Sequence, residues 1–138
     1  HTWTDVGVSV AITPASTGSK IWITGNLSMG HGGYGGMRIV RDSTAVVSST
    51  TTPGSCAPCH AGSQNSGGHV YNIMQSTANA IDAPSSTSSL TYKFQFWYNA
   101  SATIYRNREQ SDADHGNRTY AASTITVIEL SAATITTS

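Results

Sequence analysis

The sequence has little charge and few cysteines, and it lacks a long hydrophobic run. Charged residues make up 10% of its 138 residues, and seven basic residues balance seven acidic ones. We therefore expect no basic surface for nucleic acid or for an anionic membrane. No apolar stretch approaches the roughly 18 residues that a membrane-spanning helix needs, so no membrane insertion is expected. The chain is long enough to bury a hydrophobic core without disulfides or metals.

Motifs for catalysis and metal binding are also missing. The acidic residues fall mostly in predicted turns, and none forms the carboxylate pair that glycosidases use. No serine stands in a Gly-x-Ser-x-Gly elbow, and the glycine-rich residues 30–36 lack the Lys-Ser/Thr of a phosphate-binding loop. Residues 112–117 offer oxygen ligands at alternate positions, but they lack the acidic residue that completes an EF-hand. We therefore expect neither an enzyme nor a metal site.

The sequence does contain a series of alternating segments separated by Ser, Thr, Gly and Pro. Strands are expected at residues 6–12, 21–28, 37–41, 44–47, 70–76, 90–98, 102–106 and 122–130. Residues 30–36 and 48–68 are expected to be loops. About eight short strands at this spacing predict an all-β fold, a single antiparallel β-sandwich or jelly roll over residues 1–138. The polar tail at residues 131–138 either frays or pairs with a neighbouring subunit.

Residues 90–98 carry the strongest strand pattern of the chain. One face of this strand gathers Leu90, Tyr92, Phe94, Phe96 and Tyr98. Because aromatic rings contribute much of the area buried in a core, this face predicts the centre of the sandwich. A second apolar face gathers Ile21, Ile23 and Leu27. Residues 102–106 should pair back on residues 90–98 as a hairpin, and residues 122–130 should form a central strand.

The phrases around these strands occur in an order that resembles one family. They are Thr13-Pro14, Ser19-Lys20-Ile21, residues 41–44, 84–88 and 92–96, Asn107-Arg108 and residues 123–129. Their joint order over residues 6–130 is similar to that of the small terminal β-domains of tail-fibre and other virion structural proteins of tailed bacteriophages, especially marine and cyanobacterial phages. The resemblance implies a β-sandwich or jelly-roll module on the exterior of the virion, commonly a homotrimer.

The same resemblance implies a function in assembly or host attachment. We expect a tail-fibre-type module that contacts other virion proteins and recognises a host-surface receptor, most simply a glycan. The alternative within this class is a capsid decoration or cement protein, in which the aromatic faces bind the capsid. Specificity in such a module belongs to its loops, which differ most from the family pattern.

Four side chains are the candidate ligand contacts. Sugars stack their apolar faces on aromatic rings and accept hydrogen bonds from polar side chains nearby. Tyr34 and His31 lie in the glycine-rich stretch, and Trp22 and Trp97 lie on the less apolar faces of their strands. The alternative for the two tryptophans, which we favour, is packing against a neighbouring subunit, because Trp is enriched at interfaces.

The sharpest chemical motif is Cys56-Ala57-Pro58-Cys59-His60. C-x-x-C-H is the attachment pattern of c-type haem, in which two thiols bind the porphyrin and the histidine ligates iron. The flanking segments are polar, so they offer a porphyrin little to pack on. We favour a loop in which Cys56 and Cys59 form a local disulfide, with free thiols as an alternative. An extracellular haem protein centred on Cys56, Cys59 and His60 is the alternative of a different class.

Overall fold

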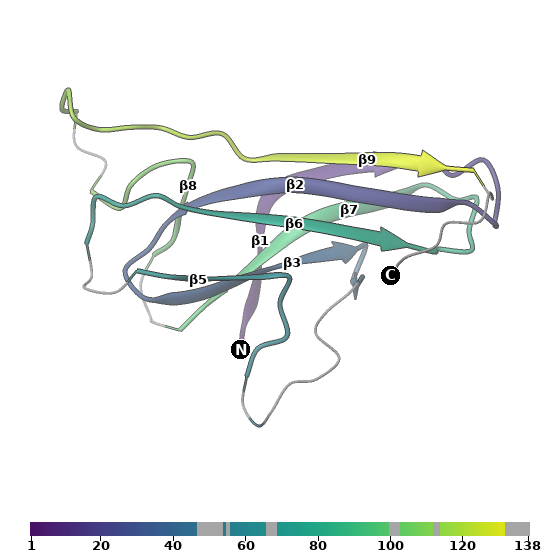
Figure 1. Cartoon of the computed structure of the whole chain (residues 1–138), viewed down its shortest axis with the longest axis horizontal. Coiled ribbons are helices and arrows are strands. Elements are labelled where there is room, and N and C mark those ends of the chain that lie inside the picture. The colour runs from purple at the N-terminus through teal and green to yellow at the C-terminus, as the bar shows by residue number, and fades with distance from the viewer. Residues whose placement is uncertain (47–53, 55, 66–68, 100–102, 112–113, 132–138) are drawn as a thin grey trace.

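The computed structural model describes residues 1–46, 54, 56–65, 69–99, 103–111 and 114–131 (Figure 1). These residues form two antiparallel β-sheets that pack face to face, and none of them is helical. The expected all-β antiparallel sandwich is thereby confirmed. Within the described part of the chain there is no helix that is long and apolar enough to cross a membrane. The tail at residues 132–138 lies outside the described residues, and so does Val47 of the expected strand 44–47.

The five-stranded sheet has β7 and β3 at its centre. Its order is β1 (Trp3–Ile12), β7 (Leu90–Tyr98), β3 (Tyr34–Arg41) and β4 (Thr44–Ala45), and β5 (Ala61–Gln64) pairs with β3 beside β4. The four-stranded sheet is built around β2 (Lys20–Gly30). On one side of β2 lies β6 (Met74–Asp82); on the other side lie β9 (Thr124–Leu130) and β8 (Tyr105–Arg106).

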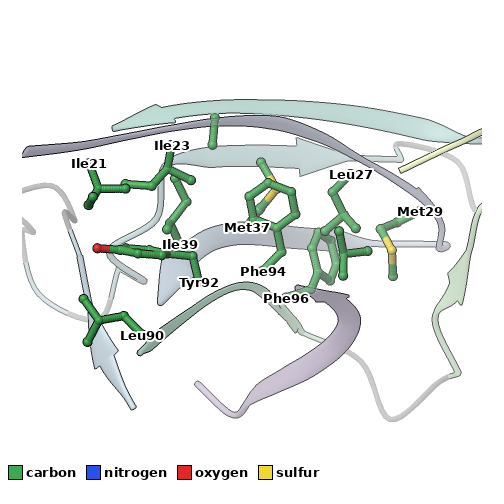
Figure 2. Packing of buried hydrophobic residues seen from close by; sticks show 12 residues of the cluster. Ile21, Ile23, Leu27, Met29, Met37, Ile39, Leu90, Tyr92, Phe94 and Phe96 are labelled. Atoms are coloured by element: carbon green, nitrogen blue, oxygen red, sulfur yellow. The ribbon is translucent and has the colours of Figure 1, made fainter. Parts of the chain in front are cut away.

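The core lies between the two sheets, where the alternating apolar faces meet (Figure 2). The five-stranded sheet contributes Val8, Met37, Ile39, Leu90, Tyr92, Phe94 and Phe96, and the four-stranded sheet contributes Ile21, Ile23, Leu27, Met29 and Ala78. Both apolar faces expected from the sequence are therefore confirmed. The large Phe94 ring fits because β2 has Gly25 opposite it, where a Cβ atom would lie 2.9 Å from Phe94 Cζ.

A partly buried polar cluster ties the two sheets together at one end of the core. Asp82 of β6 accepts a hydrogen bond from the Tyr92 hydroxyl of β7 at 2.8 Å. The same carboxylate pairs with the Arg41 guanidinium of β3. Burial, and then the neighbouring Asp82, raise the pKa of the Tyr92 hydroxyl, so this hydroxyl stays a proton donor at neutral pH. The cluster therefore fixes the register between strands that belong to different sheets.

Parts of the two segments expected to be loops are strands, at residues 34–36 and 61–64. Tyr34–Arg41 begins within the glycine-rich stretch, and Ala61–Gln64 pairs with it. The glycines suit a strand here because their missing side chains make room for rings. A Cβ atom at Gly36 would lie 2.6 Å from Trp97 Nε1, and one at Gly35 would collide with Phe96. Close approach to aromatic neighbours, rather than turn formation, therefore explains these two glycines.

Three further expectations about strands are wrong. The described residues 103–106 do not pair back on β7, whose partners are β1 and β3, and Asn99 N after β7 donates to Tyr34 O of β3 at 3.1 Å. Instead, β8 pairs with the end of β2. The last strand, β9, is not central: among the described strands it pairs with β2 alone. The strand expected at residues 70–76 is displaced to Met74–Asp82, where β2 provides a continuous partner.

Candidate functional site

A cleft of about 600 Å³ opens on the outer face of the five-stranded sheet, over β3, β5 and the end of β7. Its side walls include Tyr34, Gln64, Trp97, Asn99, Cys56 and Cys59. Alternation along β3 explains why this is the outer face. Met37 and Ile39 point into the core, so the even-numbered positions 34 and 36 point away from it.

A pair of glycines creates the hollow. Gly36 of β3 and Gly62 of β5 lie directly opposite each other in the antiparallel register. Above Gly36 the space is filled, because a Cβ atom there would lie 2.6 Å from Trp97 Nε1 and 3.2 Å from Cys59 Sγ. Above Gly62 the space is open, and the nearest heavy atom to a Cβ there would be Gly35 O at 3.9 Å. The cleft therefore has a backbone floor with an indole on one side.

Tyr34 and Trp97 place two aromatic side chains at this cleft. Tyr34 is 53% exposed, and its backbone N–H donates to Asn99 Oδ1 at 3.0 Å. Trp97 is partly buried, and its ring meets the His1 ring edge-on with 4.4 Å between the centroids. The two rings come from neighbouring strands, β3 and β7, whose register is fixed by paired residues. A ligand in the cleft would therefore meet aromatic surface beside the amides of Gln64 and Asn99.

The cleft lacks carboxylate, lysine and arginine side chains. None of the described residues that line it is Asp, Glu, Lys or Arg, and His1 is the histidine among them. Burial raises the pKa of the Cys59 thiol, so this group stays protonated at neutral pH. A neutral lining favours a neutral polar ligand over a phosphate, a nucleotide or a charged peptide.

His31 lies behind the cleft rather than in it. The residue is only 1% exposed, and its ring contacts Phe96 and Tyr98 with centroid distances of 5.4 and 5.5 Å. Its Nε2 atom lies 2.8 Å from the hydroxyl of Ser63, which belongs to β5. Burial lowers the pKa of His31, so the ring is neutral at neutral pH. The expectation of direct ligand contact does not suit this position, because the side chain supports β5 from the core side.

Trp22 lies far from the cleft in the fold, on the outer face of the four-stranded sheet. Two of the four candidate ligand residues, Tyr34 and Trp97, are thus brought together, and Trp22 and His31 are not. Gln64, Asn99 and Gly62 were missed by sequence reasoning. They are small or polar residues in segments without alternation, and only the β5–β3–β7 register brings them to one place.

The C-x-x-C-H segment forms part of the cleft wall. Cys56 is exposed and Cys59 is partly buried, and the structure has both as free thiols rather than as the local disulfide expected from the sequence. His60 follows them and fills the gap between β5 and β4 at the edge of β3. Its backbone N–H donates to Met37 O at 2.8 Å, and its Nδ1 accepts the Ile39 N–H at 3.2 Å.

This geometry of His60 does not fit covalent haem. Because Nδ1 accepts a hydrogen bond, the proton of the neutral ring is on Nε2, and that atom is buried. A histidine that ligates a metal through Nε2 has the opposite arrangement and donates its Nδ1–H to an acceptor. Burial also lowers the pKa of His60. The side chain therefore acts as a backbone acceptor that completes the edge of β3.

Nothing else among the described residues gathers metal ligands. No group of three or more His, Cys, Asp and Glu side chains lies together there as a metal site. Asp112, part of the weak calcium pattern, lies outside the described residues. No protein-family model matches the chain, and no curated protein matches it significantly.

Proposed function

We propose that this domain is a non-catalytic binding module that recognises a neutral glycan in the cleft between Tyr34 and Trp97. The observation that carries the proposal is the composition of the cleft. Two aromatic side chains and the amides of Gln64 and Asn99 surround an open backbone floor. Sugars need such a mixture, because their C–H faces stack on rings and their hydroxyls exchange hydrogen bonds with neutral polar groups.

The cleft favours binding over glycoside hydrolysis. Hydrolysis of a glycosidic bond generally uses two carboxyl groups about 5–10 Å apart, one on each side of the bond. Neither Asp nor Glu is among the described residues that line this cleft. The lining therefore supports binding of a sugar rather than its hydrolysis by a carboxylate pair.

The biological setting of the proposal comes from the sequence resemblance. A terminal domain of a tail-fibre-type protein would sit on the virion exterior as a homotrimer, joined to other virion proteins, and its ligand would be a glycan of the host surface. A capsid decoration protein would use the same fold to bind the capsid instead. Binding to intact host cells supports the first role, and binding to purified capsids supports the second.

The test is a binding screen against immobilised neutral oligosaccharides, followed by titration of the best one with tryptophan fluorescence as the readout. Tyr34→Ala should weaken binding about fivefold, because stacking on one ring contributes about 1 kcal/mol. Gly62→Val should abolish binding, because its side chain enters the open space above the floor while meeting no atom closer than ordinary contact. Trp22→Ser, on the other sheet, is the matched control and should bind as the wild type does. Absence of binding to any neutral glycan, or binding that survives both cleft variants, would overturn the proposal.

A further inference from the structure

The outer face of the four-stranded sheet carries an apolar row that the sequence does not reveal. Trp22 of β2 pairs with Ile81 of β6 on one side and with Ile128 of β9 on the other. The exposed fractions of Trp22, Ile81 and Ile128 are 40%, 36% and 41%, which is high for large apolar residues. They come from strands that are far apart in the sequence and lie side by side in the sheet (Figure 1). Three exposed apolar side chains in one cross-strand row form a patch rather than scattered single residues.

The strands around this row pair without interruption, and their outward side chains are almost uncharged. The register of β2 with β6 and with β9 runs without a bulge. Outward side chains occupy alternate positions of residues 20–26, 75–81 and 124–130, and Lys20 is the only charged one among them. The remaining outward positions carry Leu130 and the neutral polar residues Thr, Asn and Gln. Depletion of charge around a central Trp is typical of the buried part of protein–protein interfaces.

From these features we infer that this face is where a second copy of the chain packs. The row is self-complementary, because isoleucine stands at both ends of it and tryptophan stands in the middle. When two such faces meet across a twofold axis, Ile81 faces either itself or Ile128, so apolar surface meets apolar surface in both arrangements. Lys20 lies at the end of the face, two residues from Trp22, where its ammonium group stays in water.

The size of the face sets the strength of the contact. Three strands spaced by about 4.8 Å, with seven residues rising about 3.3 Å each, span a plane of about 330 Å². Two such faces cover about 660 Å², and although the side chains present more surface than the plane itself, this is below the roughly 1,200 Å² at which stable specific interfaces begin. Association through this face alone should therefore be reversible, with a dissociation constant on the order of micromolar or weaker.

The inference goes beyond the proposed function, because a twofold contact differs from the threefold contact of a homotrimer, and it does not depend on the glycan cleft, which lies on the other sheet. Its test is sedimentation velocity from about 1 to about 500 µM, a range that brackets micromolar association. Wild-type protein should be monomeric at the low end and larger than a monomer at the high end. Trp22→Ser should be monomeric throughout. Thr126→Lys, which puts a charge beside the row without removing apolar surface, should also be monomeric.

Tyr34→Ser is the matched control, because it removes an exposed aromatic side chain from the cleft instead of from this face. It should associate as the wild type does and bind the glycan more weakly. Trp22→Ser should bind the glycan as the wild type does and stay monomeric. Circular dichroism and thermal unfolding show whether each variant is folded; if Trp22→Ser is not, Thr126→Lys decides. A wild type that stays monomeric, or a Thr126→Lys variant that associates normally, would overturn the inference. Binding of a monomeric wild type to an insoluble polysaccharide, lost in Trp22→Ser, would also overturn it and assign the face to carbohydrate.

Discussion

The two sheets use their outer faces differently, although both cover the same core. On the outer face of the four-stranded sheet, the outward positions of β2, β6 and β9 carry one charged side chain, Lys20. The outer face of the five-stranded sheet carries a polar ladder in which Asp5 accepts hydrogen bonds from Lys93 at 2.6 Å and from Gln95 at 2.7 Å. Arg38 continues this ladder, donating to Gln95 and lying 4.3 Å from the centroid of the Trp3 ring.

The glycines explain the hollow on the five-stranded sheet. On the five-stranded sheet, Gly36 and Gly62 stand opposite each other; Trp97 and Cys59 cover Gly36, and Gly62 leaves the backbone beside them bare. On the four-stranded sheet, Gly25 occurs in β2, but it points inward to Phe94, so the outer face keeps its full set of side chains. The direction in which a strand glycine points thus decides whether it serves the core or opens a site.

The largest expected effect separates the two glycines of the cleft. Gly36→Val should lower the free energy of unfolding by about 1–3 kcal/mol, because its Cβ atom would lie 2.6 Å from Trp97 Nε1 and force the indole to move. Gly62→Val should change it by less than about 0.5 kcal/mol, or raise it, because valine suits a strand and the space is open. Urea unfolding of both variants measures the difference. Equal losses at the two positions would mean that the floor of the cleft is packed differently from the structure.

Much of the fold could be predicted because alternation is a local property of the sequence. The boundaries of β7 follow directly from the run of aromatic residues at 90–98, and Ile21, Ile23 and Leu27 identify the core side of β2. The short strand β5 could not be predicted, because it is four residues of mixed polarity. It is a strand because it pairs with Tyr34–Met37 of β3, and the sequence of residues 61–64 alone does not indicate that pairing.

For the same reason, only part of the candidate site could be predicted from the sequence. Tyr34 and Trp97 could be singled out as aromatic side chains away from the predicted core. Their meeting at one cleft depends on the pairing of β3 with β7, and the open floor depends on the pairing of β3 with β5. The C-x-x-C-H motif, in contrast, suggested a haem site that the geometry of His60 does not fit. Its spacing is that of a haem site, but the ring of His60 is already engaged by the backbone of Ile39.

The next prediction concerns His60, the side chain that closes the edge of β3 beside the cleft. His60→Leu should lower the free energy of unfolding by about 1–3 kcal/mol, because the partly buried Ile39 N–H loses its acceptor. His60→Asn should cost less, since its amide oxygen can stand near the position of Nδ1. Thermal or urea unfolding at pH 7.5 compares the two variants. Equal costs would show that packing of the ring, rather than its hydrogen bond, matters at this position.

The lowered pKa values of His60 and His31 predict how the stability of the fold changes with pH. Burial holds the pKa of His60 and that of His31 below the usual value of 6.5, so the unfolded chain binds protons more readily than the folded one. Stability should therefore be complete above about pH 6.5 and should decline as the pH falls toward the lowered values in the folded state. The decline should be shallower in His60→Asn, which keeps only His31. A wild-type stability that does not change between pH 7.5 and 5 would contradict this account.

The smallest expected effect compares the charged face with the uncharged one. Asp5→Ala breaks the contacts with Lys93 and Gln95, but the carboxylate is largely exposed, so the loss should be about 0–1 kcal/mol and should shrink in high salt. Hydrogen bonds from Lys93 and Gln95 lower the pKa of Asp5, so its small contribution should be present at neutral pH and disappear as the pH falls below about 3.8. Thr126→Lys should leave the unfolding free energy of dilute, monomeric protein unchanged within about 0.5 kcal/mol. Because neither face contributes much to the stability of a single subunit, we interpret their contrast in charge through the inferred packing, in which the ladder stays in water and the neutral row meets a second copy of the chain.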